Sequence, residues 1–107
     1  MKSKFNLKVL NRLILLNILP KQTNFLALKL IKDLEDKISF NENEQKELEL
    51  KILENGLPAW NGEKDKGKEF EIGEKTQDII IDALKKLDKD NKLTKDHFST
   101  YEMFVKE

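Results

Sequence analysis

Apolar residues in this chain change their spacing twice, and that change constrains the fold more than any other feature. Between Phe25 and Ile38 they recur at intervals of three and four, the period of an amphipathic helix. Between Leu48 and Ile52 they alternate with polar residues, as in a strand, and after Gly73 the helical period returns. The 107 residues are therefore predicted to form one α+β domain with about five helices and a small antiparallel sheet. Its helical part is expected in 1–46, the sheet in 47–72 and a helical pair in 73–107.

The segment Asn6–Leu19 is predicted to be a helix that ends before Pro20, because the residue before a proline avoids the helical region. Its second half is apolar nearly all round, which is typical of a helix buried on more than one side. In so small a domain, we expect a second copy of the chain to cover part of that surface. The sequence thus predicts a homo-oligomer that assembles through this N-terminal helix.

Two capping signals predict where the next helices begin. Thr23 or Asn24 can cap a helix that runs to about Ile38. Asn41 with Glu44 resembles a capping box and predicts a short acidic helix over residues 42–47.

A hairpin is predicted next, because Asn55-Gly56 is a strong turn signal between two short apolar stretches. Another alternating stretch, residues 68–72, predicts a third strand that joins the same two- or three-stranded sheet. The order helix, helix, helix, strand, turn, strand over the first 72 residues is similar to a winged helix. In that interpretation the loop before the last strand is the wing, and Lys64, Lys66 and Lys68 are candidate nucleic-acid contacts. Against it, the third helix carries four glutamates and one lysine, which oppose binding to phosphates.

The C-terminal part is predicted to be two helices. One follows Gly73, and Thr94 caps the other, whose inner face is expected to comprise Phe98, Tyr101, Phe104 and Val105. His97, the single histidine, is expected to cap or pack at the start of that helix. The turn from Asp88 resembles a calcium loop but lacks the glycine and the glutamate that such a loop needs, so no metal site is expected.

Residues 62–68 (GEKDKGK) fit the first seven letters of the phosphate-binding pattern G-x-x-x-x-G-K, but Glu69 stands where the pattern needs Ser or Thr. The loop is also followed by a strand pattern, whereas a phosphate loop leads into a helix. We therefore interpret it as a surface loop with a chance match.

The net charge of zero conceals an uneven distribution. Residues 1–32 carry seven basic residues and no acidic one, so residues 33–107 total −7. This asymmetry is typical either of a binding site for an anionic partner or of attraction between or within chains. If an anion such as a nucleotide binds, the free N–H groups at the start of the second helix attract it, and Trp60 can stack on a base. The candidate anion-binding residues are Lys8, Arg12, Lys21, Thr23, Asn24 and Trp60.

No arrangement of residues indicates catalysis. The chain has no cysteine and one histidine, and its carboxylates are dispersed rather than paired. We expect a protein that is not an enzyme and needs no cofactor. The longest apolar stretches are too short for a bilayer, so no membrane association is expected. For a chain without cysteine, a cytoplasmic location is the default expectation.

Taken whole, the sequence resembles a family of small uncharacterised proteins carried by tailed bacteriophages and their prophages. The resemblance covers nearly the full length and rests on VLNRLILLNILP (9–20), SFNENEQKELELK (39–51), AWN (59–61) and the closing residues 71–104. It implies a phage accessory protein in the cytoplasm of an infected bacterium and transfers no catalytic residue.

The expected function is therefore a non-catalytic phage accessory protein that antagonises a host component, such as one of antiphage defence. It would do so either by binding a host protein or by sequestering a nucleotide messenger. The alternative is a winged-helix-like DNA-binding regulator.

Overall fold

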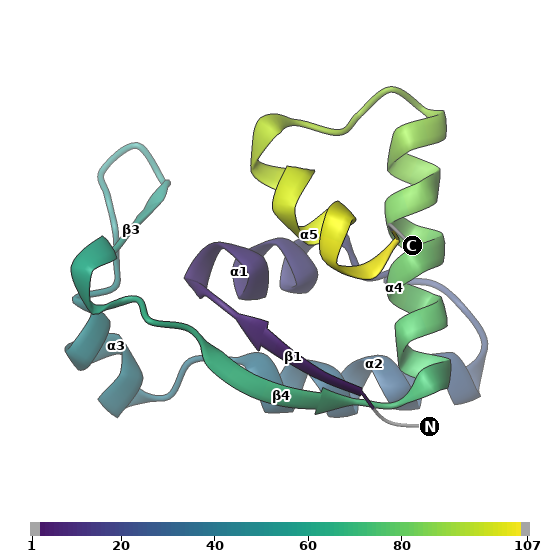
Figure 1. Cartoon of the computed structure of the whole chain (residues 1–107), viewed down its shortest axis with the longest axis horizontal. Helices are drawn as coiled ribbons and strands as arrows, with labels where there is room; N and C mark the ends of the chain where they lie inside the picture. The colour runs from purple at the N-terminus through teal and green to yellow at the C-terminus, as the bar shows by residue number, and fades with distance from the viewer. Residues whose placement is uncertain (1–2, 106–107) are drawn as a thin grey trace.

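A strand that the sequence did not predict opens the fold. The computed structural model describes residues 3–105, and in it β1 (Ser3–Leu7) pairs antiparallel with β4 (Lys68–Ile72). Ser3 lies opposite Ile72 and Leu7 opposite Lys68 (Figure 1). The prediction that the first helix begins at Asn6 was wrong, because Phe5 and Leu7 face inward on a strand. The alternation of apolar and polar residues over 5–7 is too short to predict a strand by itself. These residues form one because they pair with β4, more than 60 residues away.

The elements confirm the predicted α+β class. Five α-helices, two 3₁₀ helices and two small antiparallel sheets lie within residues 3–105. The helices are α1 (Val9–Ile18), α2 (Phe25–Ile38), α3 (Glu42–Leu48), α4 (Glu74–Lys89) and α5 (Phe98–Phe104), with 3₁₀ helices η1 (Gly62–Lys64) and η2 (Lys95–His97). The second sheet consists of β2 (Lys51–Ile52) and β3 (Pro58–Ala59).

Two predicted caps are confirmed. The Asn24 side chain accepts a hydrogen bond from the main-chain N–H of Ala27 at 2.8 Å and begins α2. Asn41 and Glu44 form the predicted capping box of α3, in which each side chain accepts a hydrogen bond from the other residue's main-chain N–H. α1 ends at Ile18, just before Leu19 and Pro20, as expected.

The predicted hairpin forms, but the predicted third strand does not join it. β4 leaves the β2–β3 hairpin and pairs with β1 instead. The lysine-bearing loop between β3 and β4 therefore does not close a hairpin, and the prediction that it is a wing was wrong. The winged-helix-like order of elements exists in sequence, but the strand pairing differs because β1 supplies a longer partner than β3 can.

The hydrophobic core lies between the β1–β4 ribbon and four helices, α1, α2, α4 and α5 (Figure 1). Ile80 and Leu84 of α4 are completely buried, and the ring of Phe5 stacks on that of Phe104 with centroids 4.5 Å apart. Elements of the same chain bury Val9, Ile14 and Leu15 of α1, whereas Leu10, Leu13, Leu16 and Ile18 are half-buried. The homo-oligomer through this helix stays a prediction. The core members are Leu7, Leu15, Leu19, Ile31, Leu34, Ile38, Phe70, Ile72, Ile80, Leu84 and Phe104.

The start of α5 differs from the sequence prediction. Phe98 was expected on the inner face, but its side chain is 65% exposed, and Thr100 and Phe104 are the buried residues of this helix. The reason is local: residues 95–97 form a 3₁₀ turn, whose three residues per turn shift the helical face that follows.

Among residues 3–105, no helix has both the length and the apolar character that a membrane crossing requires.

Candidate functional site

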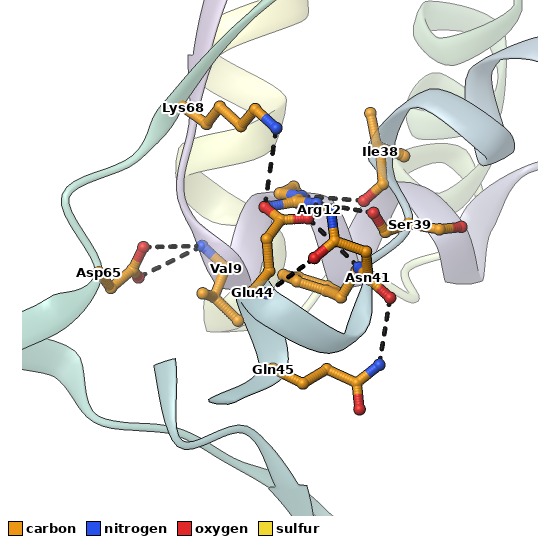
Figure 2. A network of polar contacts seen from close by, with 10 residues as sticks. Val9, Arg12, Ile38, Ser39, Asn41, Glu44, Gln45, Asp65 and Lys68 are labelled. Carbon is orange, nitrogen blue, oxygen red and sulfur yellow. Dashed lines mark hydrogen bonds and ion pairs between the residues drawn. The ribbon is translucent and has the colours of Figure 1, made fainter. Parts of the chain in front are cut away.

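Arg12 lies at the centre of a buried polar network that joins α1, α2 and α3 (Figure 2). Its side chain is 3% exposed. The guanidinium donates to both carboxylate oxygens of Glu44, at 2.8 and 3.1 Å, in a bidentate ion pair. It also donates to the carbonyl oxygens of Ile38 and Ser39, both at 2.9 Å, where α2 ends. Arg12 therefore serves as the C-terminal cap of α2 and fixes α3 beside it.

Aromatic rings and a second cation complete this network. The guanidinium carbon of Arg12 lies 3.9 Å from the ring centroid of Phe40 and 5.1 Å from that of Phe70. Lys68 places its Nζ 3.9 Å from Glu44 Oε2. The hydrogen bond from Arg12 is the largest of several causes that hold the pKa of Glu44 below its ordinary value of 4.5. The charge of Arg12 is thus balanced inside the protein by an ionised carboxylate.

Asp65, in the middle of the GEKDKGK loop, caps the N-terminus of α1. Its two carboxylate oxygens accept the main-chain N–H of Val9 at 3.1 and 3.3 Å (Figure 2). The first turn of α1 contains no acidic residue of its own, so Asp65 supplies the negative charge that a helix N-terminus favours. The position at which a phosphate would meet this helix is therefore taken by a carboxylate of the chain. Gly67 has φ +82°, and the loop then enters strand β4 rather than a helix, as the alternation over residues 68–72 predicted.

The three lysines of this loop lie on a groove of mixed charge. The groove has a volume of about 710 Å³, and Glu44, Glu47, Glu63 and Asp65 line it together with Lys64, Lys66 and Lys68. Carboxylates thus accompany the lysines, and two of them already bind Arg12 and Val9. Such a surface does not form the basic stripe that duplex DNA attracts.

The structure does not bring the six candidate anion-binding residues together. Arg12 lies in the first turn of α1, whereas Lys21, Thr23 and Asn24 are exposed on the connection that follows the other end of this helix. Lys8 is exposed at the start of α1, and its main-chain N–H donates to Asn11 Oδ1. Trp60 follows the hairpin and is half-buried on a different groove.

That second groove lies between α3 and the β2–β3 hairpin and has a volume of about 640 Å³. Two contacts position the hairpin against α3: Asn61 donates its main-chain N–H to Leu48 O at 2.7 Å, and its side chain to Glu49 at 3.2 Å. Glu49 adopts φ 56° and ends the helix, which turns the chain sharply into β2. The lining residues are Glu42, Gln45, Lys46, Glu49, Leu50, Lys51, Ala59, Trp60 and Asn61.

Three large aliphatic side chains stand exposed on the hairpin beside this groove. Ile52 is 68% exposed, Leu53 41% and Leu57 59%. Leu53 and Leu57 lie opposite each other on one side of the hairpin, whereas Ile52, opposite Pro58, projects from its other side. We call Leu53 and Leu57 the hairpin face. In Figure 1 the hairpin projects from the body of the molecule, away from the core helices. The surrounding segment 42–57 carries five glutamates against two lysines. The hairpin face is therefore apolar with an acidic border, a pattern typical of a protein interaction site.

Sequence reasoning missed this face although its signal was present. The Asn55-Gly56 turn correctly indicated a hairpin, and residues 68–72 were expected to join its sheet. The strand expected over 48–52 is shorter, since α3 extends to Leu48 and β2 comprises only Lys51–Ile52. Only the diversion of β4 to β1 leaves the hairpin without a third strand and exposes its aliphatic residues.

The role expected of His97 is confirmed, since its Nδ1 accepts the main-chain N–H of Thr94 at 2.9 Å and thus caps the turn that leads into α5. Within residues 3–105, no three His, Asp or Glu side chains are grouped so as to hold a metal ion. Comparison with protein-family models, with curated proteins and with solved structures finds no match to this chain.

Proposed function

We propose that this chain is a non-catalytic binding protein that covers the surface of a partner protein with its hairpin face. In keeping with the resemblance to phage accessory proteins, we propose that the partner is a host protein, in the cytoplasm of an infected bacterium, whose activity is thereby blocked. The observation that carries the proposal is the exposure of Leu53 and Leu57 on a projecting hairpin.

Physical reasoning supports a protein partner with an apolar cleft and a basic border. Removing a large aliphatic side chain from water contributes about 1.5–3 kcal/mol, so the Leu53–Leu57 pair can anchor an interface. Glu54 lies in the turn between Leu53 and Leu57, and residues 42–57 have a net charge of −3, so lysine or arginine is favoured on the partner.

The other two candidate functions receive less support. Nucleotide sequestration relied on Arg12, whose guanidinium already binds Glu44 and two carbonyl oxygens. DNA binding relied on the lysine loop, whose groove also contains four carboxylates. A protein partner requires neither group.

The proposal can be tested by affinity capture from a bacterial lysate, followed by titration with the purified partner. Leu57→Asp places a charge on the hairpin face, and Phe98→Asp is the matched control, because Phe98 is similarly exposed but lies on α5. We expect one protein to be captured in stoichiometric amount by the unchanged chain and by Phe98→Asp. With Leu57→Asp, both its capture and its binding in isolation should be lost. Equal binding by all three chains, or capture of no protein, would contradict the proposal.

A further inference from the structure

A second exposed apolar patch lies at the start of α2. Phe25 is 81% exposed, Leu26 58% and Leu28 39%, so this end of the helix holds three large side chains outside the core. The helix enters the core only from Ile31 onward, through Ile31, Leu34 and Ile38. We call Phe25, Leu26 and Leu28 the α2 patch.

The α2 patch and the hairpin face have opposite electrostatic surroundings. Residues 20–32 carry Lys21, Lys29 and Lys32 and no acidic residue. Residues 42–57, around the hairpin face, have a net charge of −3. Each patch would therefore repel a second copy of itself and attract the other patch.

The two patches also lie at opposite ends of the molecule. Figure 1 shows the hairpin at one end of the long axis, and α2 runs from the other end toward it. The molecule extends 34 Å along this axis. One copy therefore cannot bring its own two patches into contact, but two copies can join head to tail.

We propose that the α2 patch of one copy docks on the hairpin face of a second copy. In this contact Phe25 and Leu26 meet Leu53 and Leu57, while Lys21 and Lys29 face Glu54 of the hairpin turn. The contact is heterologous, since different surfaces of the two copies meet. Each copy keeps one patch free after docking, so the assembly grows by further copies into a chain or closes into a ring.

This inference stands apart from the proposed function but shares one surface with it. A host protein and a second copy would compete for the hairpin face. The α2 patch takes part only in contact between copies, so Phe25→Asp separates the two ideas. It should abolish self-association yet leave capture of the host protein unchanged.

Two single variants test the contact by complementation. In one variant, Phe25→Asp blocks the α2 patch and leaves the hairpin face intact. In the other, Leu57→Asp blocks the hairpin face and leaves the α2 patch intact. The folding of both is favoured: position 25 is the first residue of α2, where a carboxylate interacts well with the helix dipole, and Leu57 is exposed. Because both blocked patches carry aspartate, they cannot pair with each other in a mixture.

The measurement is sedimentation velocity over a wide concentration range, with Phe98→Asp as the control variant. The unchanged chain and the control should form species larger than a dimer as concentration rises. Each aspartate variant alone should remain a monomer, and their equimolar mixture should stop at a dimer, because only one pair of intact patches is available. A monomeric unchanged chain, self-association of either variant, or a monomeric mixture would overturn the proposal. Circular dichroism of each variant establishes that it is folded.

Discussion

The carboxylate of Asp65 accepts the main-chain N–H of Val9 across 56 residues of sequence, at 3.1 Å. This contact joins the lysine-bearing loop to the first turn of α1 and replaces the acidic residue that this turn lacks. The GEKDKGK loop, which matches most of a phosphate-binding motif, therefore stabilises the start of α1.

Asp65→Ala should therefore destabilise the protein through α1. Loss of an N-terminal cap costs about 0.5–2 kcal/mol, and we expect urea-induced unfolding to shift by that amount. Lys66→Ala, one residue further along the same exposed loop, is the control and should change the free energy of unfolding by less than about 0.5 kcal/mol. Equal effects of the two substitutions would show that Asp65 does not act as a cap.

Arg12→Met should be among the most damaging single substitutions outside the apolar core. It removes the partner of a half-buried Glu44 and leaves two carbonyl oxygens at the end of α2 without their donor. Breaking a buried ion pair in this way costs about 3–5 kcal/mol. Denaturant unfolding measures the loss.

A double-mutant cycle with Glu44→Gln isolates the part that belongs to the ion pair. The double variant should lose less free energy than the two single losses added together. Simple additivity would mean that Arg12 acts through the α2 carbonyls rather than through Glu44.

The pH dependence of stability should also report on Glu44. Because its pKa is lower in the folded protein than the ordinary value of 4.5, its contribution is fully present above that value. The contribution is lost as pH falls through the lowered folded pKa. We expect the urea midpoint of the unchanged chain to fall more steeply below about pH 4.5 than that of Glu44→Gln. Parallel curves for the two chains would contradict this coupling.

The hairpin face should contribute little to folding, as expected of a surface kept for binding. Leu57→Ala should change the free energy of unfolding by less than about 0.5 kcal/mol. Leu84→Ala removes the same atoms from a completely buried position of α4 and should cost about 2–5 kcal/mol. A large loss with Leu57→Ala would indicate that the hairpin packs on the body instead.

The local elements could be predicted from the sequence because their signals are local. Asn24, the Asn41–Glu44 box and the Asn55-Gly56 turn each act within four residues, and the structure has each where it was expected. The pairing of β1 with β4 could not be predicted, because the residues of neither strand specify which other strand it pairs with. Because this pairing was not predicted, the first helix was placed too early, the lysine-bearing loop was interpreted as a wing, and the hairpin face was missed.

The candidate site was less accessible to sequence reasoning for a related reason. A positive charge in an acid-free segment suggests an anion site, but the burial of Arg12 and its distant partner Glu44 become visible only in three dimensions. Trp60 and Lys21 were grouped with Arg12 by charge and aromatic character, and the fold separates them.

The β1–β4 pairing sets the order in which the protein can be completed on the ribosome. Ser3 is made before α1, yet its partner Ile72 is made only after α1, α2, α3 and the hairpin. Closing so long a loop is slow compared with forming the helices, so the nascent chain carries an unpaired strand and an incomplete core until β4 appears. Charge and strand pairing are thus completed at different times: residues 33–54, with eight acidic and three basic residues, balance most of the charge of residues 1–32 before the partner of β1 is made.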